Sequence, residues 1–523
     1  MPGRSELTSD EATSSATRIL RSGYNCWRID RAERFSCVQD AADYFRLVRH
    51  AILQARETIF ILGWDIQSTL DLVPGGASDD APTRLDELLK WAIRRRPQLA
   101  CHVLIWDYAE LYALEREPLT RWRLGWQMPR QVRFAFDDHH PIGGSHHQKI
   151  IVVDDVLAFC GGIDLTGHRW DTTAHRVEEP ARVNASGSPY EPYHEVQAMV
   201  CGPVAASLGT LVRRRWQALG EALQPAAPAS LGGLWPDAVE PDLTDIDVAI
   251  ARTVPASESE PGIRECEQLF VDSIAAARQS IYIESQYFTS DALGRALAAR
   301  LQEPEGPEIL LVIPKECHGW LEKQTMGALR DEVLRLLIAS DRWRRLRVVY
   351  PGASRARDIP TFVHSKVMIV DDRFVRIGSA NFSRRSMGVD SECDLAIDAG
   401  SDPAHRAGVQ RIRDRLIGEH LGVSADAVAD EVGRVGSLRV LVDAHAHADH
   451  TLCRVDQSGP AGAPSEVLKA AADPEEPLDF VADTIYRRAR RRVRSLGAAL
   501  RFLLPIRLSS SAARRHREDA EFG

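Results

Sequence analysis

Two pairs of stretches far apart in the chain are near copies of each other. Residues 55–61, Ala-Arg-Glu-Thr-Ile-Phe-Ile, resemble residues 277–283, Ala-Arg-Gln-Ser-Ile-Tyr-Ile, at an offset of 222 positions. Residues 147–154, His-Gln-Lys-Ile-Ile-Val-Val-Asp, match residues 364–371, His-Ser-Lys-Val-Met-Ile-Val-Asp, at an offset of 217. Because the offset changes so little over this distance, the pattern indicates a tandem duplication of one unit whose loops differ in length.

Each copy shows the same alternation of helix and strand patterns. A segment of helical period, at 41–55 or 263–278, leads into a short strand rich in β-branched and aromatic residues. Another helix pattern and a second strand follow in both copies. This alternation predicts an α/β fold of two duplicated α/β sandwich units, each with a mixed or mostly parallel sheet covered by helices. The predicted strands are 59–61 and 101–106 in the first copy and 281–283 and 309–314 in the second.

Composition marks the boundaries between the copies. Residues 222–262 are rich in Pro, Ala and Gly and are typical of a connecting segment, and a similar stretch covers 458–477. The predicted organisation is an N-terminal extension at 1–30, a first repeat at 31–221, a linker at 222–262, a second repeat at 263–425 and a C-terminal extension at 426–523.

The best match between the copies is the pattern His-x-Lys-x4-Asp. From the composition it is expected only about 0.01 to 0.02 times by chance in this chain. It occurs twice, at equivalent points of the duplication, and uses two of only six lysines among 65 basic residues. Because the rest of the basic residues are Arg, retention of Lys149 and Lys366 suggests that an ammonium group is needed there.

The spacing of the pattern fixes where its members lie. His and Lys at positions i and i+2 share a face at the start of a strand. The apolar runs 150–153 and 367–370 then predict strands buried on both faces. Asp154 and Asp371 follow at the far end of these strands. They are included among the candidate catalytic residues, although a structural hydrogen bond is the favoured role at that position.

Two imidazoles and two ammonium groups that face one another would form a strongly cationic pocket. Phosphate is the natural guest of such a pocket. One neutral and one protonated histidine, His147 and His364, can act as nucleophile and general acid. Lys149 and Lys366 would stabilise the charge on the phosphoryl oxygens. Since neither copy can do this alone, we expect one active site shared between the halves.

Further stretches around the two motifs share a recognisable pattern. They are Gly144–Lys149, Gly161–Leu165, Arg169–Asp171 with His175, Tyr193–Gln197, Gly202–Pro203, Ile281–Phe288, Ile377–Asn381 and Arg385–Glu392. With the paired motifs, these stretches closely resemble the phospholipase D superfamily, and within it the phosphatidylcholine-type phospholipases D rather than the small nucleases. The resemblance extends from about Trp27 to about Glu419, with Ser285 in place of the Asn of that branch.

The resemblance implies a mechanism and an architecture. It implies a monomer whose halves are related by a pseudo-two-fold axis, and a two-step ping-pong reaction. In that reaction His147 attacks phosphorus and forms a phosphatidyl-histidine. His364 protonates the departing alcohol and then removes a proton from water or another alcohol. The order of the two histidines follows from the resemblance alone.

Other residues are assigned by their position in the resembling stretches. Glu195 and Glu392 are candidates for orienting the two imidazoles at their other nitrogen. Asp164, the counterpart of Asn381, is expected to anchor a loop, because an ionised carboxylate repels phosphate. These roles require no metal and no cofactor. The candidates for binding the substrate phosphate are Asn381, Ser379, Gln148 and Gln286, with Ser365 as a further candidate for lining the pocket.

Charge and apolar content limit the possible partners. The formal net charge of −9 and the pI near 6.0 argue against a protein that acts mainly on nucleic acid. No stretch approaches the 18 or more uncharged apolar residues of a membrane helix. Nine scattered cysteines without a close Cys-x-x-Cys pair suggest a reducing compartment. We therefore expect a cytoplasmic protein that contacts phospholipid membranes peripherally, at their inner face.

Two segments outside the matched copies have patterns of their own. Residues 487–507 contain eight Arg and no acidic residue among apolar side chains, which is typical of an interfacial helix on anionic lipid and also of a basic tail packed elsewhere. The run 443–450, Asp-Ala-His-Ala-His-Ala-Asp-His, would place His445 and His447 on one face of a strand. Such a run can bind metal, but it is more often a surface feature.

The sequence thus predicts a phospholipase D-type phosphodiesterase that hydrolyses glycerophospholipids to phosphatidic acid and an alcohol, with transphosphatidylation as a further capacity. Three alternatives remain. They are a cardiolipin-synthase-like phosphatidyl transferase, a nuclease that uses the same chemistry and an inactive lipid-binding module. The intact motifs disfavour the last of these.

Overall fold

The first half of the molecule has the predicted alternation of strands and helices. The computed structural model describes residues 18–107, 124, 127–141, 143–225, 233–257, 261–317, 320–455 and 472–477. The elements of the first half are β1 (Arg28–Gln39), α2 (Asp40–Gln54), β2 (Thr58–Gly63), α3 (Leu85–Arg95), β3 (Ala100–Trp106), β4 (Val132–Asp137), β5 (Ile150–Val153), β6 (Leu157–Gly161), β7 (Tyr193–His194), β8 (Val196–Cys201) and α5 (Pro203–Ala218).

The second half repeats this order and then extends it. Its elements are β9 (Leu243–Val254), β10 (Ile263–Arg264), α6 (Glu265–Ala276), β11 (Ser280–Ser285), α7 (Asp291–Gln302), β12 (Glu308–Val312), α8 (Trp320–Ser340), β13 (Leu346–Ser354), β14 (Ile359–Pro360), β15 (Phe362–Val363), β16 (Lys366–Val370), β17 (Phe374–Gly378), α9 (Arg384–Gly388), β18 (Glu392–Asp398), α10 (Pro403–Leu421), α11 (Ala425–Val435), α12 (Leu438–His445) and β19 (Thr451–Arg454).

The strands pair in the same way in both halves. In the first half β2, β3 and β4 are parallel, and β5 runs antiparallel between β2 and β6. In the second half β11, β12 and β13 are parallel, and β16 runs antiparallel between β11 and β17. The predicted duplicated α/β fold, with a mixed sheet in each half, is therefore confirmed.

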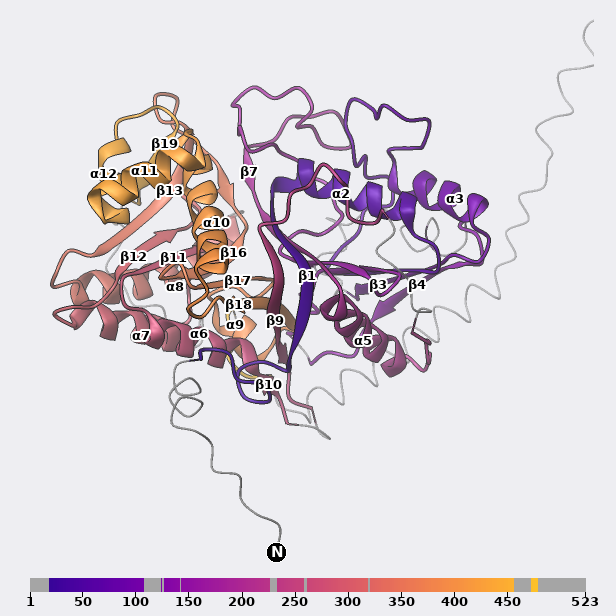
Figure 1. Cartoon of the computed structure of the whole chain (residues 1–523), viewed down its shortest axis with the longest axis horizontal. Coiled ribbons are helices and arrows are strands. Elements are labelled where there is room, and N and C mark those ends of the chain that lie inside the picture. The colour runs from indigo at the N-terminus through magenta and orange to yellow at the C-terminus, as the bar shows by residue number, and fades with distance from the viewer. Residues whose placement is uncertain are drawn as a thin grey trace, which may run out of the picture. The chain divides into compact units, whose positions relative to one another are not determined.

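Strands β1 and β9 join the two half-sheets (Figure 1). β1 pairs antiparallel with β8 of the first half and with β9, and β9 also pairs with β18 of the second half. This placement differs from the predicted linker at 222–262, because residues 243–254 form a central strand of twelve residues. The predicted boundary at 425 differs too, since β19 adds an edge strand to β13.

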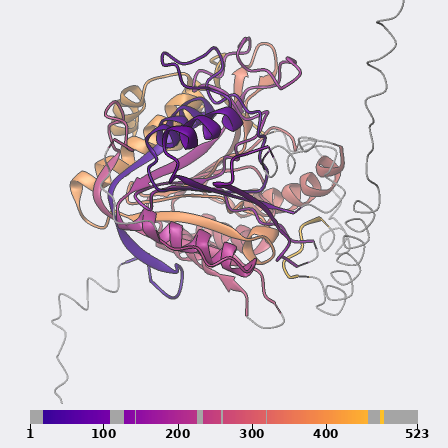
Figure 2. The ribbon, with the colours of Figure 1, turned by 90° about the vertical axis from the view of Figure 1, so that its right-hand side faces the viewer.

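The motif strands are buried on both faces, as predicted. On β5, Ile150 and Val152 belong to a core shared by the two halves, whereas Ile151 and Val153 face a second core under α2 and α3. The alternate residues of β16 divide in the same way. Figure 2 shows the first half with the indigo helix α2 on one side of the sheet and the magenta helix α5 on the other. A strand held between two cores gives the residues at its start a rigid support.

No helix in the described part of the chain is both long and apolar enough to cross a membrane. The chain divides into a unit that ends at Pro477 and a second unit over 478–523. The predicted basic helix at 487–507 falls in that second unit, outside the described residues.

Candidate active site

The backbone N–H of each motif histidine donates to a backbone carbonyl of the opposite half. The backbone N–H of His147 donates to the carbonyl of Ser391 at 3.0 Å, and that of His364 donates to the carbonyl of His194 at 2.9 Å. Strands β7 and β15, which lead to the second of these contacts, are parallel. A glutamate follows each accepting residue in the sequence. The pairing therefore brings a glutamate of one half to the histidine of the other.

The imidazoles and carboxylates consequently form two crossed pairs. His147 Nδ1 lies 3.0 and 3.1 Å from the two carboxylate oxygens of Glu392. His364 Nδ1 forms a hydrogen bond with the carboxylate of Glu195. Both glutamates are completely buried. An imidazole that donates its Nδ1–H to a carboxylate keeps the lone pair of Nε2 available for chemistry.

The surroundings favour the neutral form of both histidines. Burial and then the two lysines lower the pKa of His147 well below its usual range. Burial, Lys366 and then Arg169 do the same for His364. Burial also raises the pKa of Glu392 to about 7 and that of Glu195 above its usual range. A neutral imidazole is the form that can act as a nucleophile or a base.

The two lysines lie beside the histidines in equivalent ways. Lys149 Nζ donates to the carbonyl of His147 at 2.9 Å and forms an ion pair with Asp164 at 3.1 Å. Lys366 Nζ donates to the carbonyl of His364 and to Gln286 Oε1, the latter at 3.3 Å. Burial lowers the pKa of Lys366 to about 7. Both lysine side chains are nearly inaccessible to solvent.

Comparison with known proteins identifies the second half directly. A family model described as "Cardiolipin synthase, PLD-like domain" matches residues 270–407. Phospholipase D alpha 1 of Vigna unguiculata is 24% identical to this chain, over 75% of the chain and 65% of the relative. The chain thus matches a PLD-like domain over residues 270–407 and is similar to named phospholipases D over about three quarters of its length.

A second named phospholipase D is equally distant in sequence. Phospholipase D alpha 1 of Arabidopsis thaliana is 23% identical over 73% of this chain and 64% of its own length. The alignments thus span slightly less than two thirds of these curated relatives. Among solved structures, a phosphatidylserine synthase of Haemophilus influenzae Rd KW20 matches with a TM-score of 0.47 and 15% identity, over 79% of this chain and 94% of the other.

The two motif aspartates lie away from the phospholipase D-like site, at the far ends of β5 and β16. The carboxylate of Asp154 accepts three backbone N–H groups, from residues 56, 57 and 58, each at 2.8 Å. Asp371 accepts the equivalent three from residues 278, 279 and 280, at 2.5 to 2.8 Å. A catalytic role for these aspartates does not fit this placement. The structure instead supports the favoured structural role, in which they tie a helix end to the motif strand.

Two predicted phosphate ligands are engaged elsewhere. Gln148 donates through Nε2 to the carbonyl of Glu392 at 3.1 Å and accepts from Arg215 at 2.9 Å. Residue 148 lies between the motif His and Lys, and its side chain points to the opposite face of the strand. Ser379 Oγ donates to the carboxylate of Glu392 at 2.5 Å. Both residues therefore support the His147–Glu392 pair rather than reach a phosphate.

Other predicted residues keep positions that suit the site. Asn381 is buried, and its Oδ1 has no hydrogen-bond partner among the described residues. The hydroxyl of Ser365 is in the same state. Gln286 contacts Lys366, and Asp164 also accepts the backbone N–H of Trp64 at 2.8 Å. A phosphate-binding role for Asn381 and Gln286 remains a prediction.

The sequence analysis missed two contributors to the site. Arg169 lies with its guanidinium 5.1 Å from the ring centre of Tyr193, whose ring is 5.6 Å from that of His364. After Lys366, it is the cation that lowers the pKa of His364 most. Ser386 Oγ donates to Glu392 at 2.7 Å. Both lie in stretches that resemble the superfamily, but no spacing rule singles them out.

The Asp- and His-rich run at 443–450 has a different structure from the one predicted. His445 is the last residue of α12, and the run contains no strand. His445 Nε2 lies 3.0 Å from Glu431, and Asp443 forms ion pairs with Arg347 and Arg454. The alternation of His and Ala therefore does not place the imidazoles on one face of a strand.

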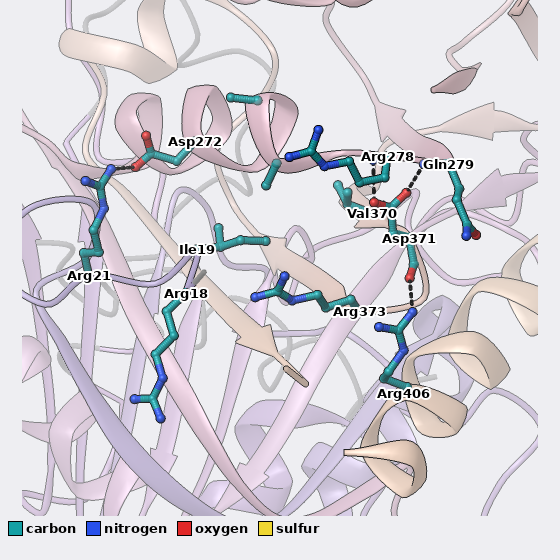
Figure 3. A pocket seen from close by; sticks show the side chains of 12 residues that line it. Arg18, Ile19, Arg21, Asp272, Arg278, Gln279, Val370, Asp371, Arg373 and Arg406 are labelled. Atoms are coloured by element: carbon teal, nitrogen blue, oxygen red, sulfur yellow. Dashed lines mark hydrogen bonds and ion pairs between the residues drawn. The ribbon is translucent and has the colours of Figure 1, made fainter. Parts of the chain in front are cut away.

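A separate cavity of about 700 Å³ lies at the end of β16 opposite Lys366 (Figure 3). Arg21 pairs with Asp272 at 2.7 Å, and Arg406 donates to the backbone carbonyl of Asp371. Its lining contains five arginines against two aspartates, so its surface is electropositive. The lining arginines are Arg18, Arg21, Arg278, Arg373 and Arg406.

Proposed function

We propose that this chain is a phospholipase D-type phosphodiesterase that hydrolyses glycerophospholipids to phosphatidic acid and a head-group alcohol. The crossed His–Glu pairs carry the proposal. They give one site two imidazoles whose Nδ1 atoms are held by carboxylates, which leaves the Nε2 atoms for chemistry, beside two buried lysines. The relatives named phospholipase D support the same reaction class.

In the first step, Nε2 of His147 attacks phosphorus. A nitrogen–phosphorus bond forms, and the bond from phosphorus to the head-group oxygen breaks. The bound anionic phosphodiester favours a proton on His364, which passes to the departing oxygen. Lys149 and Lys366 stabilise the charge that develops on the phosphoryl oxygens. In the second step, His364 removes a proton from water, whose oxygen attacks phosphorus and releases the histidine.

A substrate with an activated leaving group tests the two histidine roles. Phosphatidyl-p-nitrophenol needs no proton for departure of nitrophenolate. The His364→Asn variant should therefore release about one equivalent in a burst and then stall as a phosphohistidine detectable by mass spectrometry. The His147→Asn variant should release none. The opposite pattern would exchange the two roles, and turnover by both variants would refute the phosphohistidine route.

Phosphatidyl transfer is a second candidate reaction. The description of the family model that matches residues 270–407 favours it. A lipid hydroxyl can attack the same phosphohistidine in place of water. Vesicles of phosphatidylglycerol, with products followed by mass spectrometry, distinguish the two reactions. Phosphatidic acid as the main product supports hydrolysis, whereas cardiolipin as the main product supports transfer.

We also propose that the protein contacts anionic membranes peripherally, through its arginine-lined cavity. Arg278 is exposed at this cavity (Figure 3). Arg278→Glu should weaken binding to vesicles that contain phosphatidic acid, with little change for neutral phosphatidylcholine. Arg94→Glu, an equal charge change on the exposed face of α3, is the control. Equal effects of the two variants would contradict a specific contact.

A further inference from the structure

A second cluster of histidines and carboxylates lies inside the molecule. It consists of Asp40 at the start of α2, His175 in the loop after β6, His194 of β7 and Glu419 near the end of α10. One ligand atom from each residue lies within 4.8 Å of all the others, and all four side chains are buried. The proposed phosphodiesterase chemistry uses none of these side chains.

The near nitrogens of the two imidazoles converge on the same carboxylates. His175 Nε2 and His194 Nδ1 lie 2.8 and 2.6 Å from Oε1 of Glu419. They lie 3.5 and 3.3 Å from the two oxygens of Asp40. Two imidazole nitrogens and two carboxylates that face a common point form a donor set suited to a divalent transition-metal ion.

The far nitrogens are held by a second pair of carboxylates. His175 Nδ1 lies 3.0 Å from Asp171, and His194 Nε2 lies 2.9 Å from Glu284. Metal-binding histidines are commonly oriented in this way, because the outer carboxylate fixes the tautomer that presents the other nitrogen to the metal.

The charges within the cluster also call for a cation. Four carboxylates meet the two imidazoles, and a third imidazole, His420, lies 3.1 Å from Glu284. Arg182, which lies 3.0 Å from Asp171, is the one guanidinium in contact with these carboxylates in the described part of the chain. Asp40 Oδ2 is buried and lacks a hydrogen-bond partner among the described residues. Asp40 Oδ1 accepts the backbone N–H of Glu195 at 3.0 Å, and Glu419 accepts from the Gln39 amide. The described contact of Oδ2 is the 3.5 Å ion pair with His175, and a buried carboxylate oxygen without a hydrogen bond is costly unless something binds it.

We propose that Asp40, His175, His194 and Glu419 bind one structural divalent metal ion, with Zn²⁺ as the best match to the donors. The ion would replace the two protons between the near nitrogens and Glu419 at unchanged total charge. The ligand atoms need to separate only slightly to admit bonds of about 2.0 to 2.2 Å. Four protein ligands and complete burial leave no open position for substrate, so the site is structural.

The metal would fix the position of the strand that supports His364. β7 places Tyr193 against the His364 ring and the carbonyl of His194 on the His364 backbone, and Glu195, the next residue, contacts His364 Nδ1. Through His194, the ion would link β7 of the first half to Glu419 of α10 in the second. This role goes beyond the proposed function, and its test does not depend on lipid turnover.

Elemental analysis of the full-length protein tests the site. Protein purified without chelators from zinc-supplemented medium should contain about one zinc per chain. Protein from metal-depleted medium should have a Tm lower by several degrees, and Zn²⁺ should restore it. X-ray absorption should show a nitrogen and oxygen shell that includes two imidazoles.

Variants separate this site from other metal-binding residues. Glu419→Gln and His175→Ala should lose the zinc. His445→Gln, which removes a partly exposed His–Glu431 pair, should retain it. Absence of zinc from wild type after incubation with Zn²⁺, with an unchanged Tm, would overturn the proposal and leave a protonated imidazole network. Retention of zinc by both ligand variants would also overturn it. If neither variant folds, the metal content and Tm of wild type decide.

Discussion

The Glu392 carboxyl group is completely buried and is in contact with His147 Nδ1 and with the hydroxyls of Ser379 and Ser386. These contacts fix the tautomer of the imidazole. The burial of the same carboxyl group is unfavourable for its negative charge. Burial, followed by repulsion from Asp390, raises the pKa of Glu392 to about 7. A single residue would therefore link the proposed catalysis to the stability of the fold.

The Glu392→Gln variant should make this link visible. Between pH 4.5 and 7 the folded protein retains a proton that the unfolded chain has lost. The corresponding stabilisation is complete below pH 4.5 and is lost as the pH rises through 7, in total about 3 kcal/mol. Glutamine carries no such charge, so the Tm of the variant relative to wild type should rise between pH 5 and pH 8. Its kcat should fall by about 10²-fold or more, because a carboxylate no longer faces the imidazole.

Ser386→Ala is a second variant that tests the same explanation. The Ser386 hydroxyl stabilises the charged form of Glu392, so its removal should shift the pH dependence of stability to higher pH. A Tm difference between Glu392→Gln and wild type that does not change with pH would contradict the buried-charge explanation.

The sequence predicted which His and Lys side chains lie together better than it predicted their contacts. The paired His and Lys follow from spacing, because residues i and i+2 at a strand start must share a face. That Ser379 donates to a glutamate, or that Arg169 approaches His364, depends on loops whose path no local pattern encodes. Gln148 shows the converse, since alternation along the strand could have predicted that it points away.

At the scale of elements, the motif aspartates hold helix ends to strands. Asp154→Asn should cost about 2 kcal/mol of stability, because a neutral amide cannot accept three backbone N–H groups as a carboxylate does. Its kcat should stay within a few-fold of wild type. Asp371→Asn, the equivalent change in the second half, should behave alike in thermal unfolding and lipid assays. A large loss of kcat at unchanged Tm would return these aspartates to the catalytic machinery.

The end of β6 positions the other glutamate. A Cβ on Gly162 would meet Oε1 of Glu195, and its Cδ at 2.9 Å. Gly162→Ala should therefore displace the carboxylate from His364 and lower kcat by about 10²-fold. Steady-state kinetics measure this, with Gly433→Ala in α11 as the control, because nothing lies within 4 Å of a Cβ there. Equal kcat in both variants would show that Glu195 tolerates displacement.

The repeated elements were predictable from sequence because each copy supports the assignment of the other. Strand β9 was missed because it lies in a region rich in Pro and Gly and has no counterpart in the matched stretches. Its partners β1 and β18 each lie more than a hundred residues away from it in the sequence. Their pairing therefore depends on tertiary contacts that local periodicity does not report.

At the scale of the whole molecule, the site exists only where the two halves cross. Each motif histidine takes its carboxylate from the opposite half, and β1 and β9 join the halves into one sheet system. A chain that contains both halves can complete its site without a second copy. The duplication thus supplies within one chain what a single-motif protein would have to obtain by association.

This arrangement predicts that inactive variants do not rescue each other. In an equimolar mixture of His147→Asn and His364→Asn, every chain lacks one reactive imidazole, and each site draws both imidazoles from one chain. Lipid turnover by the mixture should stay at the level of the separate variants, even after co-refolding, and sedimentation should show monomers. If halves exchange between chains, a quarter to a half of the wild-type rate would reappear. That outcome would mean that the crossed pairs form between subunits, and it would replace the monomer with a swapped dimer.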